Sequence, residues 1–207
     1  MNIVISDGLI GSPAPVGNTT FVVKEGIKLE GVCNVISMLV KDESVTSESV
    51  IIISVGSWNI TASYHGLEEN CRFTASASEV FLHKAVRDLK RTLKCIKSLC
   101  EAHNLSVIIT SLIPLPDEQD CDASDANSMT ELMSKLFVAA QELIFDFNGG
   151  LEYTPLICKF LVKANHKKYF TGQLKIKPTS YKDGMPTTKI KEKMVNKILS
   201  VIDKEQN

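Results

Sequence analysis

The side chains best suited to chemistry lie in four short blocks, each beside a segment that the sequence predicts to be a strand or a helix. The blocks are Ile5-Ser6-Asp7-Gly8-Leu9, Val55-Gly56-Ser57-Trp58-Asn59-Ile60, Ile113-Pro114-Leu115-Pro116 and Tyr181-Lys182-Asp183-Gly184-Met185-Pro186-Thr187. Serine, aspartate, asparagine and glycine amides are groups that acyl-transfer sites use as nucleophile, supporting acid and oxyanion donors. These blocks are therefore the first candidates for an active site.

The segments that precede three of these blocks have the patterns of buried strands. Residues 3–5, 50–55 and 105–112 are short apolar runs, and the β-branched run 50–55 is typical of a central strand in a parallel sheet. Two other segments leave alternatives open. Residues 21–23 form either a second short strand or part of a loop, and residues 156–162 either a strand or a strand–helix junction.

Four longer segments have the periodicity of helices. Apolar residues recur every three or four positions in residues 29–39, 79–103, 128–144 and 187–203, and Ser128 and Glu131 have the spacing of a capping box. Strands that alternate with helices predict one α/β domain over residues 1–207, a three-layer α/β/α sandwich with a mainly parallel sheet. A ligand site in such a fold lies at the carboxyl ends of the strands.

In this order, and over nearly the whole chain, the four blocks resemble those of the SGNH (GDSL) hydrolase superfamily. Its blocks read roughly Gly-Asp-Ser-Leu, Gly-x-Asn-Asp, an Ile-Pro-x-Pro strand end and Asp-Gly-x-His-x-Thr. The resemblance implies an SGNH-hydrolase-like fold. In that family the serine attacks an ester carbonyl, a glycine amide and the asparagine hold the oxyanion, and the histidine is the base.

The catalytic positions of that pattern hold other residues in this chain. Gly8 stands at the nucleophile position, Trp58 at the oxyanion asparagine and Pro186 at the base. Glycine has no side chain that can attack, and proline cannot accept a proton. The supporting residues of the pattern remain, namely Asp7, Gly56 and Asp183. The resemblance therefore implies a hydrolase-like fold without its catalytic groups, and we expect no enzyme activity.

Displaced residues are the alternative that would preserve activity, as in esterase domains of retroelement type. Ser6 or Ser12 would then attack, and Asn59 would hold the oxyanion if its block is shifted by one position. The histidine nearest to Asp183 is His166, 17 residues before it, so the base would be missing. For Trp58 we favour a ring that fills the volume of the lost site over a binding platform.

No cofactor or metal is expected. The six cysteines form no CxxC pair, the four histidines lack ligand spacing, and the acidic loop of residues 117–125 lacks the glycine of a calcium loop. Without a disulfide framework, a reduced, intracellular protein is the simplest interpretation.

The net charge of −1 hides an uneven distribution of charge along the chain. Residues 159–207 contain 12 lysines and four acidic residues, whereas residues 1–158 contain 11 basic and 20 acidic residues. Such segregation indicates a polyanionic partner. The residues predicted to bind RNA lie on the helix 79–103 and in the C-terminal third, and they are Lys84, Arg87, Lys90, Arg91, Lys94, Lys97, Lys167, Lys168, Lys189 and Lys193. Tyr169, Phe170 and Tyr181 interleave with lysines and could stack on unpaired bases.

An SGNH-like domain without catalytic residues and with basic surfaces resembles the OSK domains of insect germ-plasm proteins. That resemblance implies a non-catalytic RNA-binding domain of a ribonucleoprotein-assembly protein, with mRNA untranslated regions and other ribonucleoprotein proteins as partners. It also implies a cytoplasmic location, in ribonucleoprotein granules, and no membrane association. A catalytically inactive scaffold for protein–protein contacts remains the main alternative.

Overall fold

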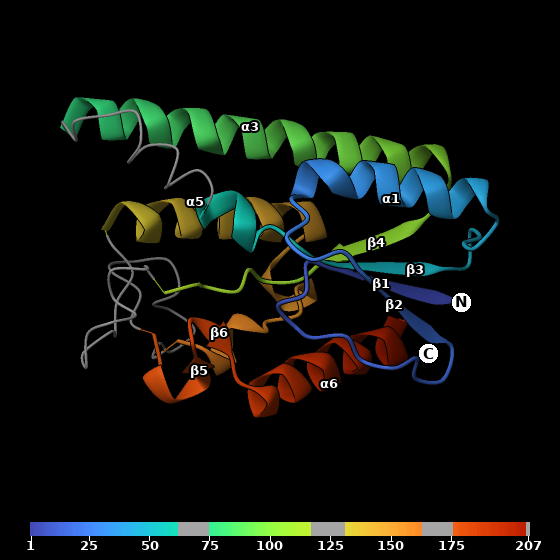
Figure 1. Ribbon diagram of the computed structural model, residues 1–207. Helices are drawn as coiled ribbons and strands as arrows, with labels where there is room; N and C mark the ends of the chain where they lie inside the picture. The colour runs from blue at the N-terminus through green and yellow to red at the C-terminus, as the bar shows by residue number, and fades with distance from the viewer. Residues whose placement is uncertain (62–74, 117–130, 163–175, 206–207) are drawn as a thin grey trace.

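A parallel sheet of four strands forms the centre of the protein (Figure 1). The structure is a computed structural model that describes residues 1–61, 75–116, 131–162 and 176–205. The strands lie in the order β2-β1-β3-β4, and every neighbouring pair is parallel. Their bounds are β1 Asn2–Ser6, β2 Thr19–Val23, β3 Val50–Ser54 and β4 Ser106–Ile109. The predicted parallel sheet is thus confirmed, and residues 21–23 belong to a strand rather than a loop.

Helices cover both faces of this sheet, and their bounds confirm the predicted helices to within a few residues. In Figure 1 the helices α1 (Leu29–Lys41), α3 (Ala75–Ala102) and α5 (Glu131–Asn148) lie above the sheet, with α3 outermost. Helix α6 (Thr188–Glu205) lies below it. The proposed cap residue Ser128 lies outside the described residues. Among the described helices, none is both long enough and apolar enough to cross a membrane.

The alternation of side chains along the strands separates two apolar cores. Ile3, Ile5, Ile51 and Ile53 pack with α1, α3 and α5, whereas Val4, Ile52 and their neighbours pack with α6. Successive residues of a strand point to opposite faces, so a strand that is covered on both faces must be apolar throughout. This explains the run Val50-Ile51-Ile52-Ile53 in β3, which is buried along its whole length.

The outer edge of β4 is closed by side chains and by a turn rather than by a fifth strand. The side-chain amide of Asn148 pairs with the backbone of Ile109, accepting from its N–H at 3.0 Å and donating to its carbonyl at 2.7 Å. Further along, the Ser111 N–H donates to the Pro155 carbonyl at 3.0 Å. Residues 156–162 contain a 3₁₀ helix, η2 (Cys158–Phe160), and no strand, so the strand alternative for this segment is wrong.

A short antiparallel hairpin precedes α6 and was not expected. Strands β5 (Tyr181–Lys182) and β6 (Met185–Pro186) are joined by Asp183 and Gly184, which both have positive φ angles, 52° and 73°. Such a two-residue turn favours the sequence Asp-Gly, because glycine adopts positive φ freely and aspartate tolerates it. The fourth block of the sequence is therefore a hairpin on the surface.

Candidate functional site

Asp7 lies just after the carboxyl end of β1 and is the one Asp or Glu side chain that is buried among the described residues. Its side chain is 3% exposed, and its Oδ1 accepts a hydrogen bond from the Leu9 N–H at 3.2 Å. The other oxygen, Oδ2, is buried and has no hydrogen-bond partner of normal geometry among the described residues. A buried carboxylate with an unpartnered oxygen loses solvation that the nearby backbone amides do not fully replace.

The pKa of Asp7 reflects this burial. Loss of solvation raises it from the ordinary value of 3.8 to about 7, and the backbone amides of Leu9, Asp7 itself and Gly56 oppose the shift. The folded protein therefore holds the proton more tightly than the unfolded chain. The stability that follows is complete below about pH 4 and is lost as the pH rises through about 7.

Asp7→Asn should remove this pH dependence. The amide has nearly the same shape as the carboxyl group and does not ionise, so the variant gains stability relative to the parent as the pH rises from about 4 to 8. The relative gain should be on the order of 4 kcal/mol, and urea unfolding at several pH values measures it. Asp146→Asn on the exposed face of α5 is the matched control for the loss of one carboxyl group. A difference between Asp7→Asn and the parent that stays constant with pH would contradict the assignment.

Gly8, at the nucleophile position, is held in a conformation that suits glycine. Its φ angle is +93°, and a Cβ atom there would lie 3.3 Å from Cγ of Glu25. The neighbouring Ser6 is fully buried, and its hydroxyl accepts a hydrogen bond from the Gly8 N–H at 3.1 Å. Ser6 therefore cannot reach a substrate in this conformation. Ser12 is exposed in the loop that follows.

Asn59, the displaced candidate for an oxyanion donor, holds the start of α1 instead. Residues 57–61 form a helical turn directly after β3. The Asn59 Oδ1 accepts from the Leu29 N–H at 2.9 Å, and its Nδ2 donates to both carboxylate oxygens of Glu30 at 3.0 and 2.9 Å. The first N–H groups of a helix have no partner within the helix, so this side chain acts as a cap from a distant segment. Its amide is not free to hold an oxyanion.

Ser57, the other hydroxyl of this block, is also engaged. It is buried, and its Oγ accepts a hydrogen bond from the Ile113 N–H at 2.9 Å. This bond ties the block after β3 to the block after β4.

Trp58 lies beside these residues, half-buried against the core that β1 and β3 share with α6. Its indole N–H is buried and has no hydrogen-bond partner among the described residues. A ring packed on this core is in the position that a space-filling role requires.

The two remaining positions of the SGNH pattern, Asp183 and Pro186, lie in the hairpin before α6 and differ in their exposure. Asp183 is exposed at the turn, and Pro186 is buried in β6. The hairpin is attached to the block after β4 by Tyr181, whose hydroxyl donates to the Pro114 carbonyl. Burial raises the pKa of that hydroxyl above its usual range, so it stays protonated and serves as a donor.

Six exposed basic residues lie along α3, and we call this set the basic face of α3. All six are exposed, namely Lys84, Arg87, Lys90, Arg91, Lys94 and Lys97. The one ion pair that involves them within the described part of the chain joins Arg91 to Asp88 at 3.6 Å, with the Arg91 side chain 83% exposed. The charge of this face is therefore largely available to a partner.

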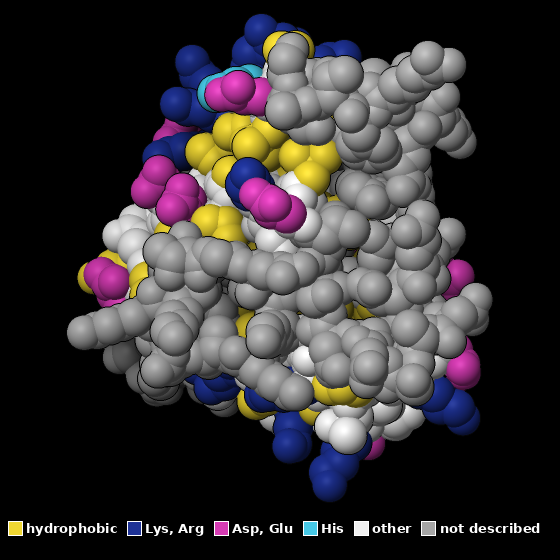
Figure 2. Space-filling view, turned by 90° about the vertical axis from the view of Figure 1, so that its left-hand side faces the viewer, with side chains coloured by type: hydrophobic (Ala, Val, Ile, Leu, Met, Phe, Trp, Pro, Cys, Tyr) yellow, Lys and Arg dark blue, Asp and Glu magenta, His cyan; other side chains and the backbone are white. Residues whose placement is uncertain are grey.

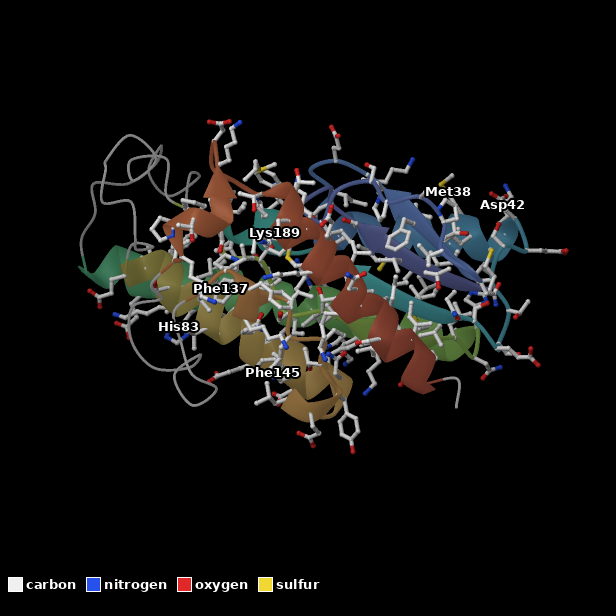
Figure 3. The ribbon with its side chains drawn as sticks, turned by 90° about the horizontal axis from the view of Figure 1, so that it is seen from below. Met38, Asp42, His83, Phe137, Phe145 and Lys189 are labelled. Atoms are coloured by element: carbon white, nitrogen blue, oxygen red, sulfur yellow. The ribbon has the colours of Figure 1, made fainter. Side chains whose placement is uncertain are left out.

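The other predicted RNA-binding residues do not join this surface. Lys189 and Lys193 are exposed on α6, which covers the opposite face of the sheet; Figure 3, seen from below, shows Lys189 on α6. Figure 2 shows the same division, with Lys and Arg side chains at the top over α3 and again at the bottom. Lys167 and Lys168, like Tyr169 and Phe170, lie outside the described residues. The structure thus divides the expected interface into two faces.

No group of three or more His, Cys, Asp or Glu side chains within the described ranges is placed to hold a metal ion. The two histidines in those ranges, His83 and His103, are both exposed and lie in α3 or just after it, away from Asp7. Comparison of the chain with protein-family models and with curated proteins finds no match.

Proposed function

We propose that this chain is a non-catalytic, SGNH-hydrolase-like domain that binds single-stranded RNA through the basic face of α3. Its partners would be mRNA untranslated regions and other proteins of a cytoplasmic ribonucleoprotein granule, as in the OSK domains that it resembles. The observation that carries the proposal is the set of six exposed Lys and Arg side chains along one rigid helix.

The sheet supports the likeness to SGNH hydrolases. The order β2-β1-β3-β4 brings β1 and β3 side by side at its centre, so the blocks Ser6-Asp7-Gly8 and Gly56-Ser57-Trp58-Asn59 leave the sheet at the same edge. A site in a parallel α/β sheet is built at this edge. The superfamily resemblance requires these two blocks to meet there.

The surroundings of those blocks support the absence of catalysis. The nucleophile position is Gly8, and the nearest hydroxyl, that of Ser6, is buried against the backbone. The amide of Asn59 is used at the start of α1. A serine without a positioned base loses several orders of magnitude in rate, so a return to activity would need more than one substitution.

The basic face of α3 supports RNA as the partner. Its residues recur at spacings of three and four along the helix, which places them in one stripe opposite the apolar side. Leu89, Leu93 and Ile96 of the same helix are buried in the core, so the helix is held firmly while its basic side faces solvent. A rigid stripe of cations suits a phosphate backbone, because little side-chain or backbone order has to be created on binding.

The salt dependence of RNA binding tests the proposal. Each neutralised phosphate of a single strand releases about 0.7 counterion, so roughly five contacts should weaken binding on the order of a hundredfold between about 50 and 200 mM salt. Fluorescence anisotropy with a labelled single-stranded RNA measures this slope. Absence of binding at about 100 mM salt would remove RNA as the partner and leave the protein scaffold.

A fluorophosphonate probe distinguishes both of these functions from the displaced-residue esterase. We expect no labelled serine, and hydrolysis of nitrophenyl esters no faster than with heat-treated protein. The exposed Ser12 is the residue whose labelling, abolished by Ser12→Ala, would restore the esterase alternative.

A further inference from the structure

An open pocket of about 330 Å³ lies where the 3₁₀ helix η1 (Leu151–Tyr153) and the residues that follow it meet η2 and α6. Its lining consists of Leu151, Glu152, Thr154, Leu156, Lys159 and Lys197. None of these residues belongs to the four sequence blocks or to the residues predicted to bind RNA. The volume is at the lower end of the range for small-molecule pockets, roughly 300–1,000 Å³.

Two lysines from segments far apart in the sequence border this pocket. Lys159 belongs to η2 and Lys197 to α6, and both are half-buried. Ile157, two residues before Lys159, and Ile198, directly after Lys197, are buried in the same apolar core. The packing of that core therefore fixes the two backbone positions relative to each other, so the pocket is part of the fold.

The positive charge at this pocket is not neutralised by its one acidic residue. The Glu152 carboxylate lies against Gly150, since a Cβ atom on that glycine would be 2.9 Å from Oε1 and 3.0 Å from Oε2. In the described part of the chain Lys159 forms no ion pair, and its Nζ lies 5.1 Å from the centre of the Phe160 ring. The Lys177 ammonium adds a further positive charge beside it, because it donates to the Lys159 carbonyl at 3.0 Å. A half-buried ammonium group of this kind is stabilised by an anion that can accept its hydrogen bonds.

The rest of the lining is apolar. Leu151 and Leu156 are half-buried, so part of each side chain is open to a ligand. The Thr154 hydroxyl is already used, because it donates to the Gly150 carbonyl at 3.0 Å and accepts from the Asn148 amide at 2.8 Å. A ligand that fits this lining combines an anionic group with an apolar or flat body.

We propose that this pocket binds a small phosphate monoester of the class of nucleoside monophosphates. Near pH 7 such a phosphate carries a charge of about −1.5 to −2, which matches two ammonium groups, whereas a carboxylate matches only one. The base would pack on Leu151 and Leu156 while Lys159 and Lys197 hold the phosphate. Free nucleotides and the terminal phosphate of an RNA strand both offer this chemistry. The proposal does not depend on RNA binding by the basic face of α3.

The test is calorimetric titration of the full chain at fixed salt with adenosine monophosphate, adenosine and inorganic phosphate. We expect the nucleotide to bind with a dissociation constant below about 1 mM, at least about tenfold more tightly than either of the other two. Absence of nucleotide binding, or equally tight binding of inorganic phosphate, would overturn the proposal.

Substitutions in the pocket locate the binding. Lys159→Gln and Lys197→Gln should each weaken nucleotide binding by about tenfold or more, because each removes a charged donor to the phosphate. Lys189→Gln is the matched control, since Lys189 is exposed on α6 and does not line the pocket. Circular dichroism checks the fold of each variant, and Lys159→Met replaces Lys159→Gln if the glutamine variant does not fold. Equal losses in the pocket variants and the control would overturn the proposal.

Two further measurements separate this site from the basic face of α3 and identify the source of the phosphate. The double variant Arg87→Glu with Arg91→Glu should bind adenosine monophosphate like the parent chain, and a loss as large as that of Lys159→Gln would overturn the assignment to the pocket. A 5′-phosphorylated trinucleotide that binds as tightly as the mononucleotide, while its 5′-hydroxyl form does not, would identify RNA ends as the ligand. Clearly weaker binding of the 5′-phosphorylated trinucleotide would identify free nucleotides.

Discussion

Charge reversal of Arg87 and Arg91 to glutamate is expected to abolish the binding of single-stranded RNA while the melting temperature stays nearly unchanged. The two residues lie one turn apart on α3 and are both exposed. Each guanidinium can grip a phosphate with two donors, and a charge-assisted hydrogen bond is worth roughly 1.5 kcal/mol or more. Losing two such contacts reduces the affinity on the order of a hundredfold, before the repulsion from the new carboxylates is counted.

The fold should tolerate this change because neither side chain belongs to the core. The only described ion pair that is lost joins Arg91 to Asp88, and an exposed pair three residues apart on a helix contributes less than about 0.5 kcal/mol. Anisotropy titrations at fixed salt and thermal melts followed by circular dichroism measure the two quantities.

A matched control changes the same number of charges outside the basic face of α3. Lys24→Glu with Lys28→Glu does so at exposed positions just before α1, where added carboxylates are compatible with the helix dipole. Its effect on RNA affinity should be several times smaller. Equal losses in both double variants would mean that net charge alone, and not the basic face of α3, drives the binding.

Among substitutions of a described glycine by alanine, Gly56→Ala is expected to cause the largest loss of stability. Gly56 follows β3 with a φ angle of +125°, and a Cβ there would lie 2.8 Å from Leu112 Cδ2 and 3.1 Å from Leu29 Cδ1. Both leucines are buried, so neither can move away into solvent. Backbone strain and overpacking together should lower the free energy of unfolding by about 3–5 kcal/mol, which urea denaturation measures.

Gly17→Ala separates the two causes. Gly17 also has a positive φ, +56°, but no atom lies within 4 Å of a Cβ at that position. Its substitution should therefore cost only the backbone term, about 1 kcal/mol. Adding Leu112→Ala to Gly56→Ala should cost less than Leu112→Ala alone, because the shorter side chain relieves the clash. Equal losses for Gly56→Ala and Gly17→Ala would show that packing around Gly56 is not tight.

Much of the fold could be predicted because it depends on local patterns. The β-branched run of β3 can only be buried on both faces, and the apolar stripe of α3 fixes which side of that helix faces the core. The hairpin before α6 could also have been found, since Asp183-Gly184 is a strong turn signal.

The candidate site could not be predicted in the same way, because it depends on contacts between residues that are far apart in the sequence. Asn59 is used by Leu29 and Glu30, about thirty residues earlier in the chain, and this becomes visible only when α1 is placed beside β3. The division of the basic residues follows from which face of the sheet each helix covers. Each of these depends on the packing of separate elements.

The placement of α3 and α6 on opposite faces of the sheet divides the exposed basic side chains between two separate surfaces instead of one broad surface. Each helix is about 10 Å across, and the sheet lies between them. The distance from the basic face of α3 to the lysines of α6, Lys189 and Lys193, is therefore greater than the Debye length of about 8 Å. A polyanion bound at one of these surfaces would then have little electrostatic effect on binding at the other. A domain that binds RNA on both sides would hold two RNA molecules at once and cross-link them into a network. A domain with one binding face would hold only one RNA molecule.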